Sequence, residues 1–439
     1  MRLSPITDIC AAVTFAVNIL EVCSLKDIIV RYILARLLTM DNELSDCIAS
    51  VVLQQYSKLP SKAKPLVRSN GVKEWTILAG VVMASGSRFE CISIGTGMKV
   101  LPNQIMQQCK GEVLHDMHAE VLALRAFNRF ILDECTRVSV NEQSTVVEAV
   151  DKFQSDDCNY LYKLKPEVKF YLYVSEAPCG DSSMGLVMAD AKNTESWTDP
   201  VIRVGENTAS EVGDKDSNPA LINDIRPVRG RDHFDVLGLV RTKPGRRDSP
   251  VTFSKSCSDK LALRQFTSIL CGAVAKVVNP KRFYLSGLVV PAAQLNTSDF
   301  TRAFSETGRL SDYINHTFPD DYQPVFFSYL GTSISFESSK EAVPNGKPCF
   351  TSLAWTPSDP CEAILGGVKM GSKPFSGKGY SLFCRKALTI QTLKLQNLQS
   401  IDSYLCYKRT NSRTTTKQIV YEILRGWLGT GRDDFGVVL

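Results

Sequence analysis

Hydrophobic and polar positions along the chain follow two periods, that of a helix and that of a strand. Over 118–132, apolar residues recur every three or four positions with charged residues between them, which predicts an amphipathic helix. Two apolar runs separated by Gly86 predict a β-hairpin over 75–97. Further buried strands are predicted over 168–178, 282–290, 324–336 and 349–355, and helices near 381–409 and 414–427. Strands that alternate with helices in this order predict an α/β fold with one mixed sheet covered by helices.

The pattern also indicates where the globular domain begins. The apolar run over 9–20 is shorter than the roughly twenty residues that a membrane span needs. Helical spacing of apolar residues starts again just after Met40. We therefore expect an N-terminal extension over 1–39 that is not part of the globular domain, followed by one domain over 41–439. Within it, residues 190–224 are rich in small polar residues without periodicity, which predicts a flexible surface insertion.

Composition and charge exclude several classes of protein. With 44% hydrophobic and 22% charged residues, the chain resembles a globular protein and not a collagen, a coiled coil or a wholly disordered chain. Its net charge of +5 is too small to indicate a nucleic-acid-binding protein by itself. The 14 cysteines lie far apart and none forms a C-x-x-C motif, which excludes zinc ribbons and thioredoxin-like redox sites. Most of them are therefore expected to be buried free thiols.

Four residues predict a catalytic metal site. His118 and Glu120 open the predicted helix over 118–132, Cys179 follows a predicted strand, and Cys257 opens a second predicted helix. One imidazole and two thiolates leave the fourth position of zinc open for water, which is typical of catalytic rather than structural sites. Glu120 can face that water without binding the metal, as a proton-transferring group must. Zinc nucleobase deaminases use this chemistry, although their two cysteines usually form P-C-x-x-C and here they lie 78 positions apart.

The motifs H-A-E, P-C-G and a distant S-C-S-D-K resemble those of the RNA adenosine deaminases. This family contains the double-stranded RNA-editing enzymes and the eukaryotic tRNA adenosine deaminases. The resemblance runs from about residue 41 to 439, and the segment R-T-K-P-G-R over 241–246 is similar to the tRNA branch, of a fungal-like type. Other matching segments are Glu74-Trp75-Thr76, Gly95-Thr96-Gly97, Val113-Leu114-His115-Asp116 and Arg229-Gly230-Arg231.

The resemblance implies a fold, a reaction and roles for individual residues. The implied fold is a three-layer, cytidine-deaminase-like α/β fold, enlarged by insertions and C-terminal helices. The implied reaction is zinc-dependent hydrolytic deamination of adenosine to inosine at position 37 of tRNA, next to the anticodon, most often in an alanine tRNA. His118, Cys179 and Cys257 would be the zinc ligands, and Glu120 would be the proton shuttle.

A local concentration of basic residues predicts the contact with RNA. Residues 226–247 contain seven Arg and Lys against Asp232 and Asp235, a local charge equal to the +5 of the whole chain. This segment just precedes Cys257, where it could hold phosphates around a nucleotide flipped into the active site. The candidate RNA contacts are Lys99, Arg229, Arg231, Arg241, Lys243, Arg246 and Arg247.

The resemblance further implies a buried inositol hexakisphosphate, because members of the family enclose this polyanion in a basic cluster. The matching positions are Arg125, Lys260, Arg264, Tyr404, Lys408 and Trp427. The chain departs from the family pattern at Leu124 and Cys271, which replace an arginine and a glutamine, and around Leu263, where a tryptophan is absent.

Two alternatives remain open from the sequence. One is a deaminase of another RNA or of a nucleoside, and the other is a non-catalytic, zinc-containing RNA-binding subunit. The presence of Glu120 disfavours the second, since a structural zinc site needs no proton-transferring carboxylate. We expect the anticodon arm of tRNA as the partner, with no membrane and no obligate protein partner. The expected location is intracellular, in the cytoplasm, the nucleus or both.

Overall fold

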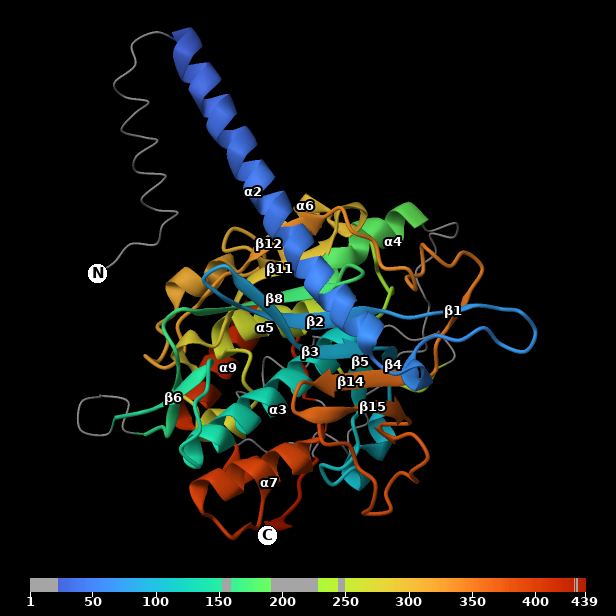
Figure 1. The fold of residues 1–439 in the computed structure, drawn as a ribbon, viewed down its shortest axis with the longest axis vertical. Coiled ribbons are helices and arrows are strands. Elements are labelled where there is room, and N and C mark those ends of the chain that lie inside the picture. Colours follow the sequence, from blue (N-terminus) through green and yellow to red (C-terminus); the bar gives the residue numbers. More distant parts are fainter. Residues whose placement is uncertain (1–22, 152–158, 191–227, 244–248, 430, 432) are drawn as a thin grey trace.

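The computed structural model describes residues 23–151, 159–190, 228–243, 249–429, 431 and 433–439, with side chains from Asp41 onward. Its centre is an eight-stranded mixed sheet with helices on both faces (Figure 1). The strands follow the order β12-β11-β8-β2-β3-β14-β15-β16 across the sheet. In chain order they are Leu78–Ser85 (β2), Arg88–Thr96 (β3), Val168–Val174 (β8), Leu285–Pro291 (β11), Ser328–Thr332 (β12), Ser352–Thr356 (β14), Asp359–Leu365 (β15) and Val368–Lys369 (β16). The predicted α/β fold is thereby confirmed.

The start of β2 and the ends of β3 and β8 lie side by side in the middle of the sheet. β8 runs parallel to β11, and β11 runs parallel to β12, while β2 is antiparallel to both β8 and β3. Ala79 at the start of β2 pairs with Val174 at the end of β8, and Leu78 pairs with Thr96 at the end of β3. The predicted hairpin is confirmed, and Gly86 lies in its turn with a φ of 58°. The residues that follow β3 and β8 carry much of the site described below.

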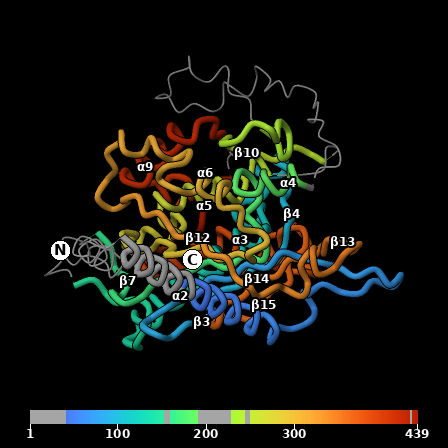
Figure 2. Tube along the Cα trace, turned by 90° about the horizontal axis from the view of Figure 1, so that it is seen from above, coloured from blue at the N-terminus to red at the C-terminus, as the bar shows by residue number. Residues whose placement is uncertain are grey.

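Two sets of helices cover the sheet. Helix α2 (Cys23–Lys58) packs on one face, where Ile48 and Val52 are fully buried in the same core cluster as strands β2 and β3. Helices α3 (Ala119–Ser139) and α5 (Cys257–Thr267) lie on the opposite side of the sheet in Figure 2. α3 confirms the predicted amphipathic helix. α2 continues without a break through Met40, so no element begins at the domain boundary expected near that residue.

Short strand pairs and helices complete the described part of the chain. The pairs are Glu74–Trp75 (β1) with Lys347–Pro348 (β13), Met98–Val100 (β4) with Asp116–His118 (β5), Val147–Ala149 (β6) with Tyr162–Leu164 (β7), Val228–Arg229 (β9) with Arg241–Thr242 (β10), and Ser400–Ile401 (β17) with Val437–Val438 (β18). Two further helices are Met184–Asp190 (α4) and Thr297–Phe304 (α6). The insertion predicted over 190–224 lies outside the described residues after Asp190. Among the described residues, no helix is both long enough and apolar enough to cross a bilayer.

The C-terminal region differs from the prediction in one place. The helix expected near 381–409 is wrong as a single element, since α7 covers only Arg385–Gln396. Asn397 adopts a left-handed conformation with a φ of 56°, which ends the helix there. A separate turn of helix follows at Tyr404–Tyr407 (α8). The last helix, expected near 414–427, is found at Asn411–Ile423 (α9).

Helix α3 lies directly on strand β3 at Gly95. A Cβ atom at Gly95 would lie 2.5 Å from the carbonyl oxygen of Ala119 and 2.5 Å from the amide nitrogen of Ala123. Both are backbone atoms of the helix, so they can give way only if the helix itself moves. The close approach therefore fixes the start of α3, which carries His118 and Glu120, against the sheet.

Substituting Gly95 with alanine is expected to displace α3 and to lower the free energy of unfolding by about 1–3 kcal/mol, because the added methyl group overpacks the helix against the strand. Denaturant unfolding of the purified protein measures this. Gly429→Ala is the control, since no atom lies within 4 Å of a Cβ at that position. Equal stability of the two variants would contradict the proposed constraint.

Candidate active site

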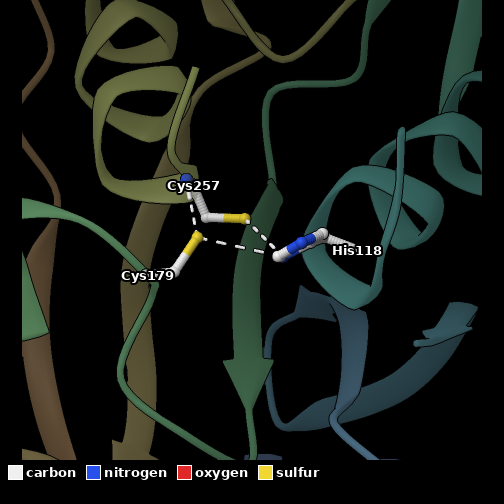
Figure 3. A group of neighbouring side chains, drawn as sticks. All are labelled: His118, Cys179 and Cys257. Carbon is white, nitrogen blue, oxygen red and sulfur yellow. Dashed lines mark hydrogen bonds between the residues drawn. The ribbon is translucent and has the colours of Figure 1, made fainter. Parts of the chain in front are cut away.

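Three separate elements bring His118, Cys179 and Cys257 together (Figure 3). His118 ends β5 and precedes α3, Cys179 lies in the loop after β8, and Cys257 is the first residue of α5. The Nδ1 atom of His118 lies 3.8 Å from the Sγ atom of Cys179 and 3.7 Å from that of Cys257. The structure thus places the three predicted ligands around one point.

This donor set fits zinc. Zinc binds thiolate sulfur at about 2.3 Å and imidazole nitrogen at about 2.0–2.1 Å, so tetrahedral coordination separates nitrogen and sulfur by about 3.6 Å. The two nitrogen–sulfur distances here, 3.7 and 3.8 Å, are close to that value. Both cysteines are free thiols. Among the residues that the structure describes, no other group of three His, Cys, Asp or Glu side chains is placed to hold a metal.

Close contacts fix the loop that carries Cys179 to the start of α5. The amide of Ser258 donates a hydrogen bond of 3.0 Å to the carbonyl of Cys179, and the Ser258 hydroxyl donates to the same oxygen at 2.9 Å. Gly180 has a φ of 105°, and a Cβ atom there would lie 2.2 Å from the Oγ atom of Ser256. Ser256 caps α5 by accepting a hydrogen bond from the amide of Asp259. The glycine after Cys179 is therefore required by both its conformation and its surroundings.

A buried lysine neutralises the thiol pair. The Nζ atom of Lys243 lies 2.7 Å from the Sγ atom of Cys257 and 3.8 Å from that of Cys179. Burial opposes its charge, but Asp116 and the two thiol groups outweigh this effect and raise the pKa of Lys243. A hydrogen bond from Cys257 and the charge of Lys243 hold the pKa of Cys179 well below its ordinary value. This corrects the expectation that Lys243 contacts RNA phosphate, because its ammonium group is enclosed within the site.

Asp116 connects this lysine to the backbone of His118. Its Oδ1 atom accepts a hydrogen bond of 3.1 Å from the amide of His118, and its Oδ2 atom lies 3.6 Å from the Nζ atom of Lys243. Oδ2 also accepts from the hydroxyl of Ser254 and binds the ammonium group of Lys260. Although burial opposes its charge, the two lysines hold the pKa of Asp116 well below its ordinary value. Lys260, predicted to contact a polyanion, is therefore already paired with a carboxylate.

Glu120 places a carboxylate beside the three ligand residues. It lies in the first turn of α3, and only 4% of its surface is exposed. Burial is the leading effect on both Cys257 and Lys243, and it raises the pKa of the thiol and lowers that of the lysine. The charge of Glu120 acts in addition and raises the pKa of both groups. The Oε2 atom of Glu120 has no hydrogen-bond partner in the described part of the protein. An unpaired buried carboxylate oxygen is costly, so this oxygen is available to bind a water molecule or a substrate.

The other predicted RNA contacts lie in different environments. Arg241 is 1% exposed, and its guanidinium group donates to the carbonyls of four residues between 230 and 236. It therefore stabilises that loop, which corrects the expectation that it contacts RNA. Arg231 is exposed, whereas Arg229 is half-buried and donates to the carbonyl of Ser249. Lys99 is half-buried at the surface, and Arg246 and Arg247 lie outside the described residues.

Three of the predicted polyanion contacts belong to a basic cluster between α3, α5 and the C-terminal helices. The cluster comprises the predicted Arg125, Arg264 and Lys408 together with Arg385, Arg413 and Lys417, which sequence reasoning missed. Burial and mutual repulsion lower the pKa of Arg264 to about 10 and that of Lys408 to about 8. Burial and the neighbouring cations also hold the pKa of Lys417 well below its ordinary value.

Few groups compensate this charge. Among the described residues, Arg385 forms an ion pair of 2.7 Å with Asp433. The predicted Tyr404 lies beside the cluster, where it interacts electrostatically with Arg385. Trp427 instead stacks on Tyr421, with 4.9 Å between the ring centroids. The cluster therefore has the charge that a polyanion requires, without acidic side chains sufficient to replace one.

Comparisons with known proteins give matches over most of the chain. The sequence profile of the adenosine-deaminase (editase) domain matches residues 93–424. A Schizosaccharomyces pombe protein named tRNA-specific adenosine deaminase 1 is 34% identical over 412 residues, covering 91% of this chain and 98% of that protein. The Saccharomyces cerevisiae protein of the same name is 32% identical over 419 residues, covering 92% and 98%. The Drosophila melanogaster double-stranded RNA-specific editase Adar is 25% identical over 253 residues, covering 56% and 33%.

The mixed sheet, the donor set and the adjacent buried acid together fit the class of zinc-dependent deaminases. The profile matches most of its length, and the chain belongs to the adenosine-deaminase (editase) domain family. The predicted resemblance to RNA adenosine deaminases is therefore confirmed, as is the prediction of an adenosine deaminase. The family also agrees with the predicted cytidine-deaminase-like fold.

Replacing Lys243 with methionine is expected to weaken zinc binding by about 10–100-fold, because the thiolates lose the cation next to them. Competition with a chromogenic chelator measures the affinity. Lys255→Met is the matched control, since Lys255 is equally buried but its Nζ atom donates to the carbonyl of Phe253. If both variants bind zinc as the unaltered protein does, Lys243 has no role in holding the metal site together.

Proposed function

We propose that this protein catalyses the zinc-dependent hydrolytic deamination of adenosine to inosine in tRNA, at position 37 next to the anticodon of alanine tRNA. The observation that carries the proposal is the buried Glu120 carboxylate, whose Oε2 atom has no partner among the described residues, beside the zinc-compatible set of His118, Cys179 and Cys257. The choice of tRNA is supported by the fungal proteins named tRNA-specific adenosine deaminase 1, which align over nearly their whole length. The substrate places the reaction inside the cell, in the cytosol or the nucleus.

The proposed roles follow from the chemistry of the site. His118, Cys179 and Cys257 would hold the zinc ion, which when bound supplies a Lewis acid that makes water reactive at neutral pH. Glu120 accepts a proton from the attacking water and delivers it to the departing amino group, so that adenosine and water give inosine and ammonia. Lys243 keeps the thiolates charged and in place.

The anticodon arm is the proposed partner, bound without an obligate protein partner. Exposed Arg231 and half-buried Lys99 remain candidates for phosphate contacts in the described part of the chain, together with half-buried Arg229, two positions before Arg231. Arg246 and Arg247 stay in the proposal on sequence grounds alone.

Inositol hexakisphosphate is the proposed occupant of the basic cluster. Six half-buried or buried cations repel one another there, and a compact polyanion would stabilise all of them at once. Arg125, Arg264, Tyr404 and Lys408 would contact it, with Arg385, Arg413 and Lys417 added by the structure. Lys260 and Trp427 would lie at its margin.

Glu120→Gln is expected to lower the rate of inosine formation by about 10²–10⁴-fold while zinc content is retained, because only proton transfer is lost. Nucleoside analysis of tRNA incubated with the protein measures the rate. The control is Glu134→Gln, on the same helix and equally buried but paired with Arg137. Full activity of Glu120→Gln would refute the mechanism, and inosine formed equally well from free adenosine would favour a nucleoside deaminase.

Lys417→Met is expected to change thermal stability in opposite directions when the basic cluster is empty and when it binds a polyanion. Without the polyanion the substitution raises the melting temperature, since it removes a buried, repelled cation; with inositol hexakisphosphate it reduces the stabilisation that the ligand provides. Thermal unfolding with and without added ligand measures both, and Lys394→Met, on the exposed side of α7, is the control.

The stability of the polyanion-free protein is also expected to depend on pH. The pKa of Lys408 falls from 10.5 to about 8 on folding, so the charge of this lysine destabilises the polyanion-free protein below about pH 8. This penalty is removed as the pH rises from about 8 toward 10.5, and stability should increase over that range. A bound polyanion should abolish the increase; an identical profile with and without it would argue against binding at this cluster.

A further inference from the structure

An exposed aromatic ring lies close to two cations. Phe350 has 60% of its surface exposed. The Nζ atom of Lys99 lies 4.8 Å from the centre of its ring, and the Cζ atom of Arg68 lies 5.4 Å from it. Both cations are within the range of cation–π attraction. The surface thus offers an aromatic face and positive charge at one place.

This ring is connected to the metal site through a single strand pair. Lys99 lies in β4, where Met98 pairs with the ligand His118 and Lys99 pairs with Met117. Phe350 precedes β14, whose first residue, Ser352, donates a hydrogen bond to the carbonyl of Met117. The aromatic ring and the ligand are therefore held in a fixed relation.

The support of the ring is rigid. Arg68 forms an ion pair of 2.9 Å with Glu74 and donates to the carbonyl of Pro348. The amide of Cys349 donates to the carbonyl of Trp75, next to the pairing of β1 with β13. In Figures 1 and 2 the loop that precedes β1 extends outward from the body of the protein, close to β13 in Figure 2.

The surroundings of the ring are apolar and basic. Leu66 and Val67, on the loop before β1, are 57% and 65% exposed. Lys73 and Lys347 are also exposed, and their backbones are hydrogen-bonded to each other. A single-stranded nucleic acid is complementary to this surface, because its bases stack on aromatic rings and its anionic phosphates bind cations.

We propose that Phe350, Arg68 and Lys99 form a stacking platform for the unpaired base that adjoins the target adenosine. The proposal rests on the proposed function. An adenosine that enters the active site leaves the base stack, so its neighbour loses a stacking partner. Phe350 replaces that partner, Lys99 supplies positive charge for a flanking phosphate, and Arg68, paired with Glu74, holds the ring in place. Phe350 is thus a specificity-determining residue for unpaired RNA.

The test compares Phe350→Ala and Phe350→Trp on an anticodon stem-loop with an adenosine at the target position. Phe350→Ala should raise KM about 10-fold or more, with kcat little changed, because stacking on one base is lost. Phe350→Trp should restore KM, since it restores the aromatic face. Ile314→Ala is the control for an exposed apolar side chain elsewhere, as Ile314 is 77% exposed.

A second substrate distinguishes stacking from a general effect. When the neighbouring nucleotide is abasic, the unaltered protein should lose as much in KM as Phe350→Ala does, and combining both changes should cost no more than one. Additive losses, or an unchanged KM for Phe350→Ala, would overturn the platform. Absence of inosine with the unaltered protein would instead overturn the proposed function, so the two failures can be told apart.

Discussion

The contact between Lys243 and the two cysteines is the interaction on which the site depends. Two thiolates in a protein interior are unstable without positive charge, and a lysine there is unstable without negative charge. Lys243 lies 2.7 Å from the sulfur of Cys257 and 3.6 Å from Asp116, so each charge stabilises the others. Asp116 in turn accepts a hydrogen bond from the amide of His118. Charge balance and ligand geometry are thereby set by the same few groups.

The basic cluster also brings like charges together in the protein interior, but these charges are positive. In the active site, buried sulfur lies next to a lysine, and a bound zinc ion would compensate its negative charge further. In the cluster, Arg264, Lys408 and Lys417 have lowered pKa values because burial and neighbouring cations disfavour their charge. Both places are therefore expected to gain stability from a bound ion, a cation at one and an anion at the other. α3 contributes Glu120 to the active site and Arg125 to the cluster, and α5 contributes Cys257 and Arg264 in the same way.

Local patterns sufficed to predict the elements and the ligand set, but not the partners of the basic residues. The spacing of apolar residues predicted α3, and the turn at Gly86 predicted the hairpin, because both depend on neighbours in sequence. The burial of Lys243 depends on Asp116 and Cys179, which are distant in sequence, and that of Arg241 on the folding of the loop before it. Two cations of a basic run that looked like a surface patch therefore proved to be internal. The break at Asn397 depends on a left-handed conformation that periodicity does not reveal. Arg413 and Lys417 did carry a signal, since they share helical spacing with buried Val420 on α9.

The central claim is that Glu120 and the three ligand residues add water to adenosine in tRNA. The most direct measurement is to incubate the protein with alanine tRNA in oxygen-18-labelled water and to analyse the nucleosides by mass spectrometry. The account predicts inosine at the position next to the anticodon, with one labelled oxygen on its base. Unlabelled inosine, or no inosine at that position, would contradict it.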